Sequence, residues 1–157
     1  MMYIGLLGMT LSRKYLHKPA QGILTPTVWI HLAPIGVIPV SLMNLLEQLP
    51  FPAAREAATV LMLLVWGFGV WWLVMAILLT LAARAAGQLP FALSWWGFTF
   101  PVGAFVAESL RLSKLLGWSS PLVIGVVAWL LLWGLWLITL NKTLRGVISG
   151  AIFKPHP

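Results

Sequence analysis

The stretch that decides the fold runs from residue 93 to residue 107 and reads LSWWGFTFPVGAFVA. It is apolar enough to lie at membrane depth, yet Gly97, Pro101 and Gly103 interrupt its middle. Backbone exposed to lipid at that depth must be fully hydrogen-bonded, so a kinked or unwound helix is tolerated only inside a helix bundle or beside a water-filled cavity. The interruption therefore indicates a pathway through a membrane protein.

The composition around this stretch defines the class of protein. Hydrophobic residues make up 61% of the chain and charged residues 8%, and the mean hydropathy is +0.96, which predicts an all-α integral membrane protein in contact with the lipid bilayer. Cysteine is absent, which excludes disulfides, thiolate metal sites and cysteine nucleophiles. The net charge of +7 would indicate nucleic acid in a soluble domain, but the cations lie between apolar runs, so we expect no nucleic-acid partner.

Four apolar segments are long enough to span a bilayer, which takes about 20 residues in a helix. They are residues 23–46, 57–83, 91–110 and 118–140, within a single transmembrane domain over residues 1–157. The opening apolar run, residues 1–11, has only about half the required length and lacks the cationic start and small-residue cleavage site of a signal peptide. We expect it to be the end of a helix that begins outside this chain.

Cationic residues are distributed unequally between the two sides that these spans define. The side with fewer cations holds Arg55, Arg111 and Lys114. The other side holds Arg13, Lys14, Lys18, Arg84, Lys142, Arg145 and Lys154. Since cationic loops stay in the cytoplasm, we expect the second side and the C-terminus to be cytoplasmic, in a multi-pass protein of a bacterial inner (plasma) membrane.

Interrupted and uninterrupted spans alternate along the chain. The second and fourth spans are unbroken runs rich in leucine, valine and tryptophan, whereas the first and third carry Pro26, Pro34, Gly36, Pro39, Pro90, Gly97, Pro101 and Gly103. The pattern predicts two transmembrane hairpins, each with a kinked inner helix and a straight outer helix. Interrupted spans in matching positions of a repeat favour a transport pathway, and the alternative is that the kinks serve only close helix packing.

Residues suited to catalysis are few. The chain has three carboxylates and three histidines, with no metal-ligand spacing and no phosphate-binding glycine-rich loop, so we expect no enzyme activity, catalytic residue, metal or cofactor. Only His31 lies within a span, where it either bonds to a neighbouring helix or lines an anion path. Glu108 is expected to be solvated at a helix end or paired with Arg111.

Small hydroxyl side chains in the kinked spans are better placed to contact a substrate. Thr25, Thr27, Ser41, Ser94 and Thr99, with backbone donors beside Pro34 and Pro101, would offer the weak, multiple donors that suit a permeating anion. The alternative is that these hydroxyls bond to carbonyls that the prolines leave free.

Aromatic residues divide into three groups. Trp29, Trp95, Trp96 and Trp118 are expected as interfacial anchors. Trp66, Trp71, Trp72, Trp129, Trp133 and Trp136 lie in the straight spans and are expected to face lipid or another subunit. Phe98 and Phe100 flank the interruption, and Phe100, directly before Pro101, could close a lumen by dewetting or steric plugging.

Two motifs resemble a known family. SWWGFTFPVGAF at residues 94–105 and TPTVWIHLAPIGV at residues 25–37 are similar to the penultimate and seventh helices of the tellurite-resistance/dicarboxylate transporter (TDT) family. That family includes malate permeases, sulfite efflux pumps and slow-type anion channels. The resemblance implies a ten-helix, usually trimeric subunit with a pore inside five kinked helices. It also implies that a phenylalanine matching Phe100, with Phe98 as second candidate, occludes this pore.

The resemblance covers helices seven to ten of that fold, so we expect the C-terminal part of a channel or carrier subunit, working as a homo-oligomer or with a complementing N-terminal half. The expected substrate is a small anion: a C4-dicarboxylate such as malate, sulfite, or an inorganic anion. Its expected path is lined by Thr27, His31, Pro34, Ser94, Thr99 and Pro101. Glu108 stands where the family has a small or hydroxyl residue. The alternatives are a membrane scaffold that conducts nothing and, third, a membrane enzyme.

Overall fold

The computed structural model describes residues 22–150, with side chains from Pro26 onward. The 3₁₀ segment η1 (Gly22–His31) leads directly into α2 (Leu32–Leu46), and a turn connects α2 to α3 (Pro52–Ala85). The 3₁₀ segment η2 (Leu93–Phe98) leads into α4 (Thr99–Leu116), which is followed by α5 (Ser119–Ile148). The expected partial helix at residues 1–11, the cations Arg13, Lys14, Lys18 and Lys154, and the Thr25 side chain lie outside this description.

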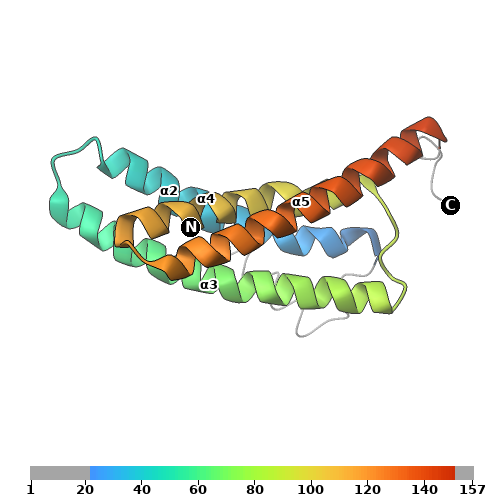
Figure 1. The fold of residues 1–157 in the computed structure, drawn as a ribbon, viewed down its shortest axis with the longest axis horizontal. Coiled ribbons are helices and arrows are strands. Elements are labelled where there is room, and N and C mark those ends of the chain that lie inside the picture. The colour runs from blue at the N-terminus through green and yellow to red at the C-terminus, as the bar shows by residue number, and fades with distance from the viewer. Residues whose placement is uncertain (1–21, 151–157) are drawn as a thin grey trace.

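The helices form an elongated bundle in which α2 and α4 lie side by side (Figure 1). α3 packs mainly against η1 and α2, and α5 packs against α4 and η2. Each kinked helix is therefore covered by the straight helix that follows it in the chain. The part of the chain that the structure describes contains no strand, which confirms the all-α class and agrees with the predicted pair of hairpins.

Three of the described helices are long and apolar enough to cross a membrane: Pro26–Leu46, Pro52–Ala85 and Ser119–Ile148. α3 extends beyond the predicted segment 57–83 at both ends, and α5 continues past the predicted end at residue 140. The predicted span 91–110 is not among the three, and its helix α4 carries three charged residues, Glu108, Arg111 and Lys114. Its crossing of the membrane stays a prediction.

Both kinked helices change from 3₁₀ to α geometry at the same place relative to a proline. Pro34 is the third residue of α2 and Pro101 the third residue of α4, and glycine follows two positions later in each. A proline in the first turn removes no intrahelical hydrogen bond, because the donors of that turn have no partner within the helix. The interruption is therefore a 3₁₀ segment before Pro101, not a break at Pro101 itself.

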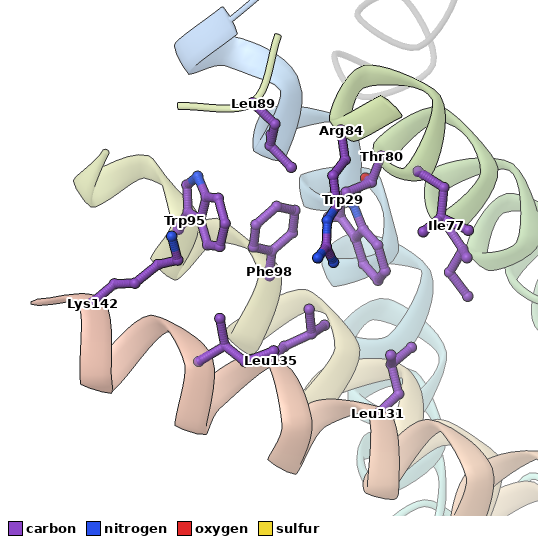
Figure 2. Close-up of a pocket in the computed structure, with 12 residues that line it drawn as sticks. Trp29, Ile77, Thr80, Arg84, Leu89, Trp95, Phe98, Leu131, Leu135 and Lys142 are labelled. Atoms are coloured by element: carbon purple, nitrogen blue, oxygen red, sulfur yellow. Dashed lines mark hydrogen bonds between the residues drawn. The ribbon is translucent and has the colours of Figure 1, made fainter. Parts of the chain in front are cut away.

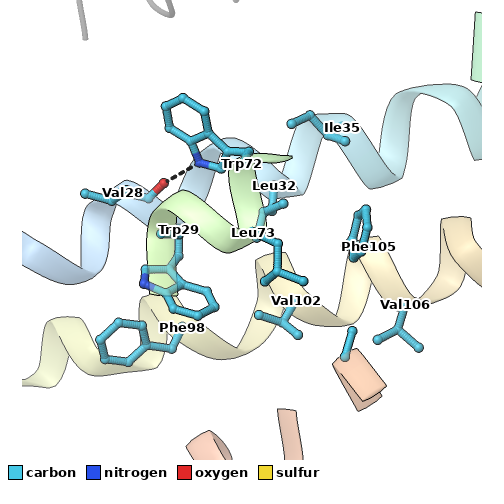
Figure 3. Packing of buried hydrophobic residues seen from close by; sticks show 12 residues of the cluster. Val28, Trp29, Leu32, Ile35, Trp72, Leu73, Phe98, Val102, Phe105 and Val106 are labelled. Carbon is cyan, nitrogen blue, oxygen red and sulfur yellow. Dashed lines mark hydrogen bonds between the residues drawn. The ribbon is translucent and has the colours of Figure 1, made fainter. Parts of the chain in front are cut away.

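The core lies where α3 meets the two kinked helices (Figure 3). Gly69 of α3 makes this approach possible, since a Cβ atom there would lie 2.7 Å from the Phe105 ring and 2.8 Å from Ile35. Trp72, expected to face lipid or another subunit, is instead buried and donates a hydrogen bond of 3.0 Å to the carbonyl oxygen of Val28 in η1. The straight helix thus supplies a donor to the 3₁₀ segment.

Candidate functional site

One side of α4 is left exposed by the other helices. Phe100, Ala107 and Lys114 are exposed and lie seven residues apart, so they share one helical face. Phe105 and Ser109 lie on the opposite side, against Gly69 and Trp66 of α3. The exposed side of α4 therefore points away from α3.

The kinked helix η1–α2 has a matching exposed side. Thr27, Ile30, Val37 and Ser41 are exposed at helical spacing, whereas Ile35 contacts α3 at Gly69 and Gly36 contacts α4 at Ala104. We call the two exposed sides together the open face. It consists of Thr27, Ile30, Val37 and Ser41 of η1–α2 and Phe100, Ala107 and Lys114 of α4.

Phe98 and Phe100, the two candidate gates, occupy opposite environments. Phe100 is 67% exposed on the open face, whereas Phe98 is 1% exposed. The Phe98 ring packs edge-on against Trp29 at 5.4 Å and Trp95 at 5.7 Å between ring centroids. Phe98 is thus a packing residue here, and Phe100 is the exposed member of the pair.

The structure distributes the expected lining residues over three environments. Thr27 is exposed on the open face, and Pro34 and Ser94 are partly buried. Pro101 is buried. His31 is partly buried, with its ring 4.9 Å from that of Trp72. The Thr99 hydroxyl donates to the carbonyl oxygen of Trp96 at 2.8 Å, and that carbonyl also accepts from the Thr99 backbone N–H, so it is not one left free by Pro101.

Glu108 departs from both sequence expectations, a solvated carboxylate or a partner for Arg111. Its side chain is fully buried on α4, and neither carboxylate oxygen has a hydrogen-bond partner among the described residues. Arg111 instead pairs with Glu47 at the end of α2. The reason is geometric: a residue three positions from Arg111 can face inward while Arg111 reaches across to the neighbouring helix.

A cavity of about 520 Å³, which no sequence pattern predicted, lies between α3 and α5 (Figure 2). α3 and α5 form its walls, and η1 and η2 contribute Trp29, Trp95 and Phe98. We call it the outer pocket. Because these contributions come from four elements, no local pattern could have predicted it. No group of three metal-ligating side chains occurs within residues 22–150.

Comparison with known proteins connects this geometry to a family. The profile of the voltage-dependent anion channel family (SLAC1) matches residues 1–144. The uncharacterized transporters MJ0576 and MJ0762 of Methanocaldococcus jannaschii are 41% identical over 155 residues and 39% identical over 153 residues. These matches cover 99% and 98% of this chain, and 45% of each relative. The sulfite efflux pump SSU1 of Trichophyton rubrum is 28% identical over 94 residues, covering 59% of this chain and 24% of the pump.

The chain belongs to the voltage-dependent anion channel family, in agreement with the resemblance inferred from its two motifs. It spans less than half the length of the curated relatives it matches. No solved structure matches it. Membership makes this a membrane protein of an anion-channel family.

Proposed function

We propose that this chain forms the C-terminal part of an anion-transporting subunit, in which the open face lines the permeation pathway and Phe100 closes it. The observation that carries the proposal is the exposure of Phe100. It projects from an inner helix whose neighbouring residues Pro101 and Val102 are buried. A large apolar ring at such a position narrows and dewets a passage.

The chemistry of the open face supports an anion as the permeating species. Its polar groups are the hydroxyls of Thr27 and Ser41 and the ammonium group of Lys114. Glu47, farther along α2, is neutralised by Arg111. Hydroxyl donors bind an anion weakly enough for it to leave again, which conduction requires.

Sulfite is the first substrate to test, because a fungal relative is named a sulfite efflux pump. C4-dicarboxylates such as malate, and inorganic anions, form the rest of the proposed range. The remaining inner helices of the pathway would come from the N-terminal part of a longer subunit or from a complementing polypeptide, in a trimer. The proposed orientation keeps the C-terminus cytoplasmic, and no enzymatic conversion of the anion is involved. The relatives compared above are archaeal and fungal, so the bacterial inner membrane stays a prediction.

Anion flux into proteoliposomes tests this proposal. The chain is reconstituted together with the N-terminal part of a subunit from the same family, and uptake of sulfite, malate and chloride is measured. Phe100→Ala is expected to raise the flux of the transported anion several-fold, since it removes the occluding ring. Phe51→Ala, which truncates an exposed phenylalanine at the start of α3, is the matched control and should leave the flux unchanged.

Two results would contradict the proposal. One is the absence of flux in both the unmodified protein and Phe100→Ala, which favours the non-conducting scaffold. The other is an equal response to Phe100→Ala and Phe51→Ala, which would remove Phe100 from the pathway.

A further inference from the structure

The outer pocket lies between α3 and α5 and shares no residue with the open face. Its floor is formed by Trp29, Phe98 and Trp95, and its sides by aliphatic residues of α3 and α5. The aliphatic residues that line it are Ile77, Leu81, Leu89, Leu131, Leu135 and Ile138. At about 520 Å³ the cavity has the size of ordinary ligand sites. An occupant of this pocket must therefore be mainly apolar.

The uncharged polar groups in the pocket wall already have partners. The Trp29 indole donates to the Thr80 hydroxyl at 2.9 Å, and that hydroxyl donates to the Ala76 carbonyl oxygen at 2.8 Å. The Trp95 indole donates to the Pro90 carbonyl oxygen at 3.0 Å. The wall thus offers no free uncharged donor, and recognition of a polar group falls to charged side chains.

Two cations, Arg84 and Lys142, complete the pocket. Figure 2 shows the Arg84 guanidinium turned inward beside Trp29 and the Lys142 side chain reaching up to Trp95 on the other side. The Lys142 ammonium lies 5.0 Å from the Trp95 ring centroid and 5.7 Å from that of Phe91, a cation–π arrangement that fixes its position without neutralising it. Within the described residues, neither cation pairs with a carboxylate.

No acidic residue of this chain can neutralise the pair. The whole sequence contains three acidic residues, and none of them lines the pocket: Glu47 and Glu56 belong to the other end of the bundle, and Glu108 lies near the middle of α4. Glu56 and Arg84 stand near opposite ends of α3, separated by roughly 40 Å along the helix axis. The end of the bundle that holds the pocket is therefore purely cationic.

The pocket opens between the two straight helices. Leu81 of α3 and Ile138 of α5 line it and are also exposed at its rim. The outward surfaces of both helices are apolar, as expected for surfaces in contact with acyl chains. Arg84 is in the last turn of α3, where a transmembrane helix reaches the headgroup region. The outer pocket therefore has an apolar part that opens toward lipid and two cations at the depth of the headgroups. A molecule with an apolar chain and an anionic headgroup would match both parts.

We propose that the outer pocket binds an anionic phospholipid of the surrounding membrane. One acyl chain would occupy the apolar part of the outer pocket, between α3 and α5 and against Phe98. The phosphate would lie between Arg84 and Lys142. Basic pockets between transmembrane helices on one side of the membrane are typical sites for anionic headgroups. The bound lipid would connect the two hairpins, which meet at this end mainly through η1 and η2.

Thermal unfolding of the purified, delipidated chain in detergent tests the proposal. Dioleoylphosphatidylglycerol is added in one sample, dioleoylphosphatidylcholine in a second and glycerol 3-phosphate in a third. The anionic lipid is expected to raise the unfolding midpoint more than the zwitterionic lipid does, because its phosphate charge is not offset by a choline cation and it should bind the two cations more tightly. Glycerol 3-phosphate, which lacks the chains, should give no shift.

Charge variants distinguish lipid binding in the outer pocket from a nonspecific attraction of the anionic lipid to a cationic protein. Arg84→Gln combined with Lys142→Gln should abolish the difference between the two lipids, whereas Lys114→Gln, which removes an exposed cation of the open face, should preserve it. Leu135→Trp, which fills the pocket without changing the charge, should also abolish it. Native mass spectrometry of the same variants gives the retained phosphatidylglycerol as a second readout that does not depend on folding stability.

Three outcomes would overturn the proposal. The first is equal stabilisation by the two lipids. The second is a double variant that still prefers the anionic lipid and retains it in native mass spectrometry. The third is a full response to glycerol 3-phosphate, which would make the site a phosphate site and not a lipid site. None of these readouts depends on anion flux.

Discussion

Gly36 of α2 lies so close to Ala104 of α4 that a Cβ atom on Gly36 would be 2.3 Å from both the carbonyl carbon and the carbonyl oxygen of Ala104. The obstacle is backbone, which cannot move aside as a side chain can. Small residues at such crossings let two transmembrane helices approach until their backbones touch. This contact fixes the distance between the two kinked helices, and with it the geometry of the open face.

Gly36→Ala is therefore expected to destabilise the protein despite the better helix propensity of alanine. Overpacking of this kind costs about 1–3 kcal/mol or more, which exceeds the gain of about 1 kcal/mol for replacing glycine in a helix. Thermal unfolding in detergent measures the change. Gly67→Ala in α3 is the control, since a Cβ atom there meets nothing within 4 Å. A Gly36→Ala protein as stable as the Gly67→Ala protein would contradict the contact.

Phe98→Ala and Phe100→Ala should differ sharply in stability. Phe98 is buried between Trp29 and Trp95, so its truncation leaves a cavity, at a cost of about 3–5 kcal/mol. Phe100 is exposed, and its truncation should leave the unfolding midpoint nearly unchanged. The two variants have the same chemistry and lie two residues apart, so each is the control for the other. Equal losses would mean that Phe100 is also packed in the folded protein.

Glu108→Gln is expected to leave the stability unchanged or to raise it. The buried carboxylate has no hydrogen-bond partner among the described residues, and an ionised group in that position costs several kcal/mol. Glutamine keeps the shape and removes the charge. Glu56→Gln on the exposed surface of α3 is the control and should have no effect. A marked drop in the midpoint with Glu108→Gln alone would show that the carboxylate has a partner it requires.

The sequence predicts the helical architecture well because hydropathy and proline spacing are local properties. The alternation of kinked and straight spans corresponds to the observed elements, whereas the gating role of Phe100 stays a prediction. The exact position of the interruption could not be read in the same way. Pro101 was expected to break a helix, but a proline in the first turn is compatible with one.

Contacts between distant elements account for the remaining differences. The sequence predicts Trp29 at a membrane interface and Trp72 facing lipid or another subunit, yet both are buried. The Trp29 indole donates to Thr80 of α3, and the Trp72 indole donates to the Val28 carbonyl oxygen of η1. The outer pocket likewise exists only through the relative placement of α3 and α5. No periodicity within one segment reports such contacts.

The central claim is that the open face lines a water-filled pathway, and cysteine accessibility in the membrane tests it most directly. The chain has no cysteine, so single introduced thiols give an unambiguous signal. Ser41→Cys and Ala107→Cys are compared with Leu64→Cys and Val127→Cys, which replace exposed residues on the outer surfaces of α3 and α5. All four proteins are reconstituted with the complementing N-terminal part.

A charged, membrane-impermeant methanethiosulfonate reagent should modify the two thiols of the open face and leave the two outer thiols unmodified, since only water ionises a thiol and carries the reagent to it. Modification of the outer pair, with Ser41→Cys and Ala107→Cys left intact, would place the open face in lipid and contradict the account.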